Sequence, residues 1–351
     1  MGPFMKLLRK RGFTPSPRNL GRLLFILQNA LWSSLLTWRE NKTNGEKLKS
    51  FPLPDDPVII IGHWRTGSTF LHQILSLDKQ FITPSFFQAT FPECFMVSEK
   101  YFRPIMGALV KKRPMDNVRL AFDDAQEDEF ALVKLIPDSP LLNVVFPLNA
   151  GYFVHNFQDF DPEKEIKEIS TKRMIEFYTR VRGDSGKILL LKNPAHSLRI
   201  PFLCEIFPKA KFIYLHRHPY KVVASSLHLW KVMAKDNQLK GKPYYPNLQE
   251  VTTVLIKFYT VIERDLAALP AGRYCEVSYE RMEADPVEEV KRIYNAFRLD
   301  FTPDFEGKVR SYLEKQKDFV KNSYNFNEDQ KEQVHLMMKK QFEKYHYSVT
   351  G

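Results

Sequence analysis

Four short runs of apolar residues stand out in the chain after residue 50: VIIIG (58–62), KILLLK (187–192), KFIYLHR (211–217) and RYCEVSY (273–279). Continuous apolar runs of this length are typical of strands that are covered on both faces, as in a parallel sheet. Helical spacing of apolar residues between and after these runs predicts helices at residues 68–77, 163–182, 197–206, 219–233, 249–268 and 285–297. The alternation predicts an α/β fold with an open, P-loop-like parallel β-sheet flanked by helices, which binds ligands at the carboxyl ends of its strands.

The first 50 residues have a different pattern. Residues 1–22 carry six basic residues and no acidic one, and the sixteen residues from Leu23 to Trp38 carry no charge. Leucines at 20, 24, 27, 31 and 35 recur at helical spacing, which predicts an amphipathic helix. The uncharged run is shorter than the roughly 20 residues of a membrane span. We therefore expect packing on the rest of the protein or, as the alternative, peripheral membrane contact through residues 1–40.

These patterns divide the chain into a basic leader with an amphipathic helix (1–50) and one domain (51–351). The net charge of +11 favours an anionic partner, such as nucleic acid, a membrane surface or a phosphorylated cofactor. The basic residues form no known nucleic-acid-binding motif, so we expect no nucleic-acid partner. Three widely spaced cysteines indicate a reducing compartment, which favours a cytoplasmic location, with membrane association as an addition.

The apolar run 58–62 leads into a loop that has the outline of a phosphate-binding loop. In the pattern G-x-x-x-x-G-K-[ST], Gly62, Gly67 and Thr69 fit, but Ser68 stands at the position of the lysine. Backbone N–H groups at a helix start bind anions without a lysine, and Arg65 can supply the positive charge. A magnesium-dependent enzyme with such a loop needs an aspartate at the end of a second strand. None of the other three runs supplies one there, so we expect no metal requirement.

Polar side chains also follow two other predicted strands. Lys192 ends the run 187–192, and His196 comes four residues later. Arg217 ends the run 211–217, and Ser225 follows eight residues on, so the two can bind one phosphate from two sides.

Two segments of the chain offer a candidate general base. Histidine suits this task near neutral pH, which favours His196. The segment DDAQEDEFAL (123–132) offers a carboxylate whose pKa its acidic neighbours can raise, with Glu127 as the candidate. The alternative interpretation of this segment is a solvated, acidic first turn of a helix. We prefer His196 and keep Glu127 as the alternative base.

The motifs RTGSTF, LKNPAH, LHRHPYKVVASS and VSYERMEADP, in this order, resemble the sulfotransferases that use 3′-phosphoadenosine 5′-phosphosulfate (PAPS). The resemblance covers roughly residues 57 to 330 and is closest to the broad, largely bacterial branch of that superfamily. It implies that residues 51–351 form a sulfotransferase domain, with PAPS as sulfuryl donor.

Residue by residue, the resemblance implies a cofactor site and a set of catalytic groups. The implied phosphosulfate loop is Arg65, Thr66, Gly67, Ser68 and Thr69. The implied 3′-phosphate pair is Arg217 and Ser225, and the implied adenine contacts are Tyr279 and Phe70. Lys192, His196 and Arg65 match catalytic positions, although Lys192 and His196 are further apart than in the Lys-Thr-His motif of the cytosolic enzymes. The C-terminal cofactor segment of those enzymes is not recognisable, and Lys321 is its candidate substitute.

The resemblance predicts transfer of a sulfuryl group from PAPS to an acceptor hydroxyl. Residues 81–122 are rich in Phe, Met and Pro, which favours an apolar acceptor wall and a lipophilic alcohol such as a sterol or lipid. Core packing of these residues is the other interpretation. A glycan or a protein tyrosine is the alternative acceptor, and a nucleotide kinase or a non-catalytic anion-binding protein is the alternative class of protein. The oligomeric state does not follow from the sequence.

Overall fold

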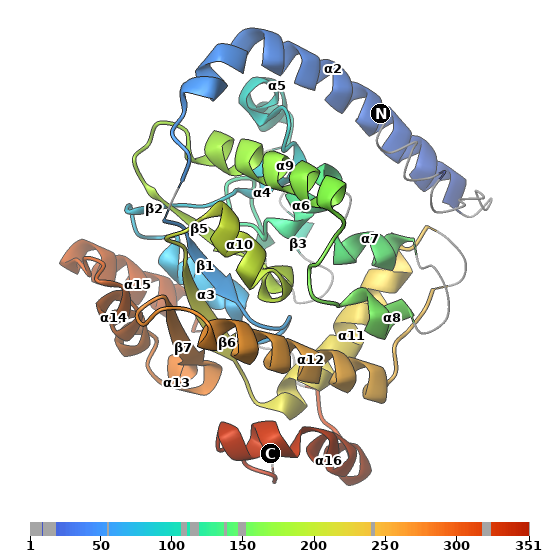
Figure 1. Cartoon of the computed structure of the whole chain (residues 1–351), viewed down its shortest axis with the longest axis vertical. Helices are drawn as coiled ribbons and strands as arrows, with labels where there is room; N and C mark the ends of the chain where they lie inside the picture. The colour runs from blue at the N-terminus through green and yellow to red at the C-terminus, as the bar shows by residue number, and fades with distance from the viewer. Residues whose placement is uncertain are drawn as a thin grey trace.

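A five-stranded sheet lies at the centre of the chain, with strand order β2-β5-β1-β6-β7 (Figure 1). The computed structural model describes residues 9, 19–54, 56–106, 111–112, 119–136, 139–146, 152–239, 243–317 and 324–350. The strands are β1 (Val58–Ile61), β2 (Phe81–Ile82), β5 (Ile188–Lys192), β6 (Lys211–His216) and β7 (Tyr274–Ser278), and every pair between them is parallel. The four predicted strands and the predicted α/β fold are confirmed, whereas the two-residue β2 was not predicted. A separate two-stranded sheet joins β3 (Lys111–Lys112) and β4 (Arg119–Leu120).

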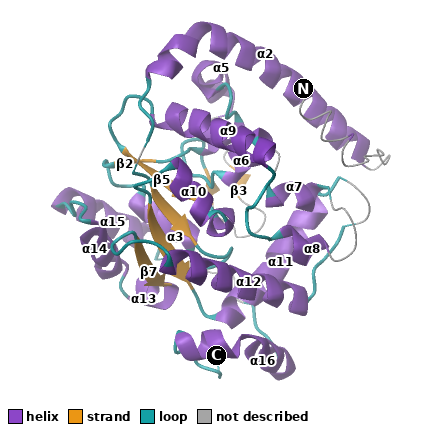
Figure 2. Cartoon of the chain, in the orientation of Figure 1, coloured by secondary structure: helices purple, strands orange, loops and turns teal. Residues whose placement is uncertain are grey.

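The apolar runs are buried because both faces of the sheet are covered, as Figure 2 shows. Side chains alternate between the faces, so Ile59 and Ile61 lie in one core while Val58 and Ile60 lie in the other. The core of Val58 packs on α3 (Ser68–Leu75), α13 (Tyr279–Ala284), α14 (Pro286–Phe297) and α15 (Pro303–Lys315). The core of Ile59 packs on α4 (Phe86–Thr90), α5 (Phe95–Met106), α6 (Glu129–Leu135), α7 (Pro140–Val145), α8 (Tyr152–Asn156), α9 (Lys164–Arg182), η2 (Pro194–Leu198), α10 (Ile200–Ile206), α11 (Pro219–Asn237), α12 (Leu248–Ala267) and α16 (Glu328–Lys344).

Helix starts follow the local sequence. The predicted helix at 285–297 is confirmed as α14, where the Asp285 carboxylate accepts a hydrogen bond from Glu288 N (3.0 Å) and Pro286 opens the helix. The helix predicted at 197–206 is instead divided into η2 and α10. Arg199 between them has an extended φ of −128°, and Pro201 in the first turn of α10 has no N–H to continue the earlier helix.

The N-terminal helix α2 (Leu20–Ser50) is confirmed and runs twelve residues beyond Trp38. It packs on α5, where the buried Glu40 carboxylate accepts a hydrogen bond from Val97 N (2.8 Å). At its other end, Asn19 Nδ2 donates to Leu239 O (2.6 Å). The helix thus contacts the rest of the protein as expected, but four of the five leucines of the predicted stripe are exposed. The division into residues 1–50 and one domain at 51–351 stays a prediction.

Candidate active site

Strand register brings the polar ends of the strands to one edge of the sheet. Ile60 of β1 lies opposite Lys192 of β5, and Ile61 lies opposite Tyr214 of β6. The strands are parallel, so their carboxyl ends meet at the same edge. The loop after β1, the end of β5 and the turn after β6 therefore adjoin one another.

The loop after β1 needs glycine at two positions. Gly62 and Gly67 have φ values of 140° and 95°, which side chains rarely adopt. A Cβ on Gly62 would lie 2.3 Å from Leu215 O, and one on Gly67 would lie 2.2 Å from the Tyr279 ring. These close approaches carry the loop backbone to the start of α3, where N–H groups of the first turn form an anion site.

Hydrogen bonds inside the protein fix the shape of this loop. Thr66 Oγ1 donates to His63 O (2.8 Å), and Ser197 Oγ accepts from Gly62 N (2.9 Å) and donates to Gly62 O (3.1 Å). Burial lowers the pKa of His63 to about 4, so this ring is neutral at physiological pH. At the start of α3, Ser68 is buried and Thr69 is half-buried. The loop is therefore held in shape before any ligand binds.

Five of the predicted cofactor residues come together at the loop. Arg65 Nε donates to Ser225 Oγ on α11 (2.8 Å), and Arg217 Nη1 donates to Arg65 O (3.3 Å). The Arg217 guanidinium lies over the Tyr279 ring at 4.1 Å from its centroid, and the same ring packs on Gly67. The fold thus gathers Arg65, Gly67, Arg217, Ser225 and Tyr279 from four separate elements, as the predicted site requires, while their roles stay predictions.

Phe70 and Lys321 complete the predicted cofactor set. Phe70 is half-buried on α3, with its ring centroid 6.3 Å from that of Tyr312 on α15. Sequence reasoning missed Tyr312, because the two rings are distant in the sequence. Lys321 lies outside the described residues.

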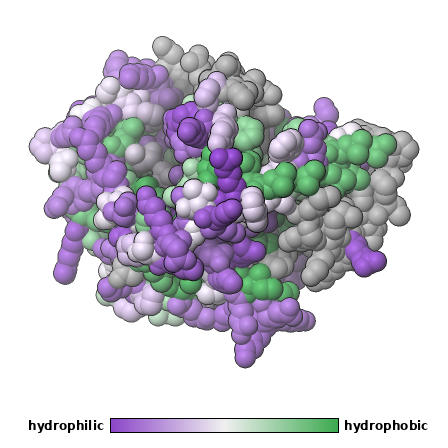
Figure 3. All heavy atoms as spheres, turned by 90° about the horizontal axis from the view of Figure 1, so that it is seen from above, coloured by the Kyte–Doolittle hydropathy of each residue, from purple (hydrophilic) through white to green (hydrophobic). Residues whose placement is uncertain are grey.

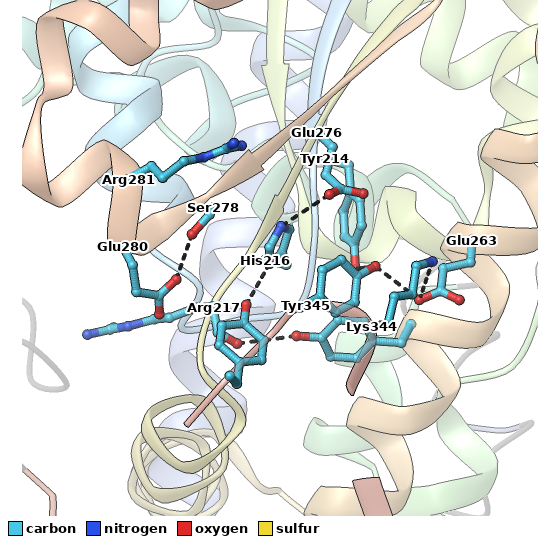
Figure 4. A network of polar contacts seen from close by, with 12 residues as sticks. Tyr214, His216, Arg217, Glu263, Glu276, Ser278, Glu280, Arg281, Lys344 and Tyr345 are labelled. Carbon is cyan, nitrogen blue, oxygen red and sulfur yellow. Dashed lines mark hydrogen bonds and ion pairs between the residues drawn. The ribbon is translucent and has the colours of Figure 1, made fainter. Parts of the chain in front are cut away.

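The turn that carries Arg217 is tied to the C-terminus of the chain (Figure 4). His216 Nδ1 contacts Tyr347 OH (2.5 Å), and His216 Nε2 lies 3.5 Å from Glu276 Oε1 on β7. The hydrogen bond with His216 holds the pKa of Glu276 below its usual value. Next to them, Tyr345 OH contacts Tyr214 OH (3.3 Å) and donates to Glu263 Oε1 (3.0 Å).

Residues further along both segments strengthen this attachment. His218 Nε2 donates to Ser348 O (2.9 Å), and Tyr220 OH donates to Val349 O (3.1 Å). The last residues of the chain thus contact every second residue from Tyr214 to Tyr220. The sequence analysis missed this support, because no motif in the last residues indicates a contact with β6.

Three consecutive acidic residues, Glu127, Asp128 and Glu129, dock on the segment from Lys192 to Arg199. Their relative exposures are 8%, 0% and 0%, so the interpretation of a solvated helical turn is wrong for them. Glu127 has the largest exposure, and its Oε2 accepts a hydrogen bond from Lys192 Nζ (2.8 Å). Burial and the Lys192 charge hold the pKa of His72, on α3, well below its usual value.

Asp128 and His196 form a fully buried pair. His196 Nε2 lies 2.8 Å from Asp128 Oδ2, and Tyr178 OH donates to the same oxygen (2.5 Å). His196 Nδ1 has no hydrogen-bond partner among the residues that the structure describes. Because its exposure is 0%, His196 sits inside the protein rather than on the site edge.

The buried Glu129 carboxylate is surrounded by hydrogen-bond donors, one of which is a guanidinium. Its carboxylate accepts hydrogen bonds from Arg199 Nη1 (2.6 Å), Asn193 Nδ2 (2.6 Å) and Ser139 Oγ (2.6 Å). Burial raises the pKa of Glu129, but the Arg199 charge and these hydrogen bonds outweigh burial and hold the pKa below its ordinary value. This pair braces the segment that carries Lys192 and His196.

The predicted acceptor wall is only partly covered by the described residues, which leave out 107–110 and 113–118. In the part that is described, aromatic rings pack on one another: Phe87 stacks on Phe122 (4.3 Å between centroids) and Phe91 on Phe102 (5.2 Å). Core packing therefore accounts for these four rings. Over the described ranges, no group of three or more His, Cys, Asp or Glu side chains is arranged to hold a metal ion.

The fold is thus α/β, with a phosphate-type loop after β1 and an arginine and a serine from the β6–α11 connection beside it. Residues 57–303 match the Sulfotransferase family. The chain belongs to this family and is a sulfotransferase. The resemblance drawn from the four motifs is thereby confirmed.

Three similar proteins come from mycobacteria. Omega-hydroxy-beta-dihydromenaquinone-9 sulfotransferase Stf3 from Mycobacterium bovis is 30% identical over 327 residues, which cover 93% of this chain and 84% of Stf3. The crystal structure of STF9 from Mycobacterium avium has a TM-score of 0.70 at 20% identity. The match covers 96% of this chain and 89% of the STF9 chain. The crystal structure of STF1 from Mycobacterium tuberculosis has a TM-score of 0.65 at 18% identity. The match covers 93% of this chain and 86% of the STF1 chain. The two crystal structures share the fold.

Proposed function

We propose that this sulfotransferase transfers the sulfuryl group of PAPS to the hydroxyl of a lipophilic alcohol. The observation that carries the proposal is the meeting of Arg65, Ser225, Arg217 and Tyr279 around Gly67. A donor with two separate anionic ends fits this arrangement, because two arginines and a serine hydroxyl lie beside a glycine loop that leads into a helix start.

In this proposal each end of the donor has its own residues. The phosphosulfate binds at the N–H groups of the loop, with Arg65, Thr66, Gly67, Ser68 and Thr69. The 3′-phosphate binds Arg217 and Ser225, and the adenine packs near Tyr279 and Phe70. The close approach of the Gly67 backbone to the Tyr279 ring supports this assignment, because any side chain at position 67 would collide with that ring.

PAPS supplies a sulfur whose bond to the phosphate oxygen breaks as the acceptor oxygen forms a new S–O bond. Lys192, with Arg65 and Ser68, stabilises negative charge on the transferring group and the departing phosphate. A base takes the acceptor proton. This chemistry needs positioned charges rather than a resident metal, and we propose that it proceeds without one.

We propose Glu127 as that base, in place of the His196 preferred on sequence grounds. Glu127 is the least buried of the three acids, and its Oε2 lies 2.8 Å from Lys192 Nζ. The proposed base and the cation that stabilises the transferring group are therefore neighbours. His196 has no exposed surface and pairs with Asp128, which supports a role in positioning the segment from Lys192 to Arg199.

The acceptor class rests on the relative Stf3, whose name gives a hydroxylated menaquinone as its substrate. A glycan or a protein tyrosine is the alternative acceptor. Family membership sets aside the nucleotide kinase and the non-catalytic protein. A cytoplasmic location and peripheral membrane contact through residues 1–40 also stay proposals.

Thermal unfolding tests the donor. We expect 3′-phosphoadenosine 5′-phosphate to raise the Tm, since a ligand at 100 times its Kd stabilises by about 2.7 kcal/mol. ATP and adenosine 5′-phosphate, which lack the 3′-phosphate, should give much smaller shifts, and Ser225→Ala should reduce the shift with the first ligand only. Equal shifts with all three nucleotides would contradict the proposed 3′-phosphate site.

Transfer from radiolabelled PAPS tests the acceptor. The panel contains a polyprenyl alcohol, a sterol, a disaccharide and a tyrosine peptide. We expect the label to enter the lipid alcohols and to depend on Glu127. Label in the disaccharide or the peptide alone would overturn the lipid acceptor and keep the donor.

A further inference from the structure

The two faces of α2 differ in an unusual way. The face toward the protein carries the buried Leu23 and Glu40, together with the half-buried Ser33 and Thr37. This inner face is therefore partly polar. Of the large apolar side chains of the helix between Leu20 and Trp38, Leu23 is buried and Ile26, Leu27 and Leu36 are half-buried, while the other seven are exposed.

Those apolar side chains point outward. Seven of the fourteen exposed large hydrophobic residues in the described part of the chain lie on α2, with relative exposures of 47% to 67%. At 3.6 residues per turn they fall on one arc of roughly 140°. The seven residues, which we call the outer face of α2, are Leu20, Leu24, Phe25, Leu31, Trp32, Leu35 and Trp38. Figure 3 shows a band of hydrophobic atoms along the edge of the molecule where α2 lies in Figure 1.

Positive charge accompanies this apolar face. Residues 1–39 contain seven basic residues and no acidic one, so they carry +7 of the net charge of +11. Lys42 lies with its ammonium 5.5 Å from the ring centroid of Trp38, and the Arg39 guanidinium lies 5.6 Å from that of Tyr101. Tryptophan with lysine or arginine at the border of an apolar face is typical of helices that lie in a membrane interface.

We propose that the outer face of α2 binds the surface of a membrane that contains anionic lipids. The apolar arc enters the boundary between headgroups and acyl chains, and the basic residues contact lipid phosphates. Among the described helices, none is long and apolar enough to cross a membrane, which suits a helix lying in the plane. A second copy of the chain fits less well as the occupant, since two such basic segments repel each other.

This inference rests on the proposed function, because a lipid acceptor gives the enzyme a reason to bind a membrane. The inner face of α2 packs on α5, which belongs to the predicted acceptor segment 81–122. Docking through α2 therefore brings that segment to the membrane side of the enzyme, and a lipid alcohol need not cross water to reach it.

Co-sedimentation of the full chain with vesicles tests the surface. The vesicles are phosphatidylcholine with and without phosphatidylglycerol. We expect binding that needs the anionic lipid and weakens with salt, and a loss of about tenfold or more in the double variant Trp32→Glu, Leu35→Glu. The matched control is Leu336→Glu on α16, where the leucine is 68% exposed, and it should bind like the wild type.

Two results would overturn the proposal: equal vesicle binding by the wild type and the double variant, or sedimentation velocity showing a wild-type dimer that the double variant abolishes while vesicle binding is absent. The Tm shift with 3′-phosphoadenosine 5′-phosphate is measured on the same samples. Retention of that shift in the double variant shows an intact donor site. If the wild type shows no Tm shift with 3′-phosphoadenosine 5′-phosphate, the proposed donor is wrong. The membrane proposal is unaffected by that result, because vesicle binding is measured independently of the donor.

Discussion

The donor side of the site and the acidic segment Glu127–Glu129 are constructed differently. On the donor side, a glycine loop and a strand–helix connection, each a short local motif, meet where Arg65 donates to Ser225, 160 residues away. In the acidic segment, each carboxylate has a polar partner more than 60 residues away, and Glu129 with Arg199 is fully enclosed. The donor side is thus shaped by backbone geometry, and the acidic segment is held by buried charge pairs. Substitutions in the two regions should therefore have different consequences.

The largest effect is expected inside the acidic segment, at its most exposed residue. Glu127→Gln keeps the size and the contact with Lys192 but removes the proton acceptor. We expect kcat to fall about a thousandfold, or about 4 kcal/mol in barrier, because a positioned base contributes 10²–10⁴. Steady-state transfer from PAPS measures it, and affinity for 3′-phosphoadenosine 5′-phosphate should stay within about twofold.

The same substitution decides between the two bases. If Glu127→Gln retains most of its kcat while His196→Gln loses it without loss of stability, the proton goes to His196. A reduced Tm in His196→Gln with little change in the pH profile of the remaining activity supports the positioning role.

The next effect concerns stability rather than chemistry. Glu129→Gln leaves the buried Arg199 guanidinium without its counter-charge, at 2.6 Å from the substituted group. Breaking a buried pair in this way costs about 3 kcal/mol or more in the free energy of unfolding. Urea unfolding measures it, and the exposed Glu46→Gln on α2, in an ion pair with Lys49, is the control with a change near zero. Equal stability of both variants would show that the pair does not brace the site.

Acid should weaken the two regions in different pH windows. His63, in the donor loop, has its pKa lowered from 6.5 to about 4 by burial, so unfolding takes up a proton between these values. Stability should therefore fall by about 2 to 3 kcal/mol as the pH drops from 6.5 to 4. Glu129 has a lowered pKa, so its contribution is present above 4.5 and is lost only below that value.

Urea unfolding across the pH range separates the two groups. His63→Gln should flatten the upper part of the curve, and Glu129→Gln the part below pH 4.5. Curves with the same shape in all three proteins would contradict both assignments.

Much of the donor side followed from the sequence because its determinants are local. Gly62 and Gly67 mark the loop by their spacing, and Arg217 with Ser225 lie within one strand–helix connection. The partners of Asp128 did not follow, since burial of an acidic residue depends on where a distant histidine comes to lie. The outward direction of the α2 stripe could not be predicted either, because periodicity gives the face of a helix and not what covers it.

The smallest effect tests whether the C-terminus supports the donor side. Tyr347→Phe removes the hydroxyl that contacts His216, next to Arg217. We expect a loss of about 1 kcal/mol in stability. We also expect about two- to fivefold weaker binding of 3′-phosphoadenosine 5′-phosphate, because the Arg217 turn gains freedom. Isothermal titration measures the affinity, and Tyr245→Phe, at a 48% exposed tyrosine, is the control. Unchanged affinity with lowered stability would limit the C-terminus to folding and leave Arg217 positioned by Tyr279 and Arg65 alone.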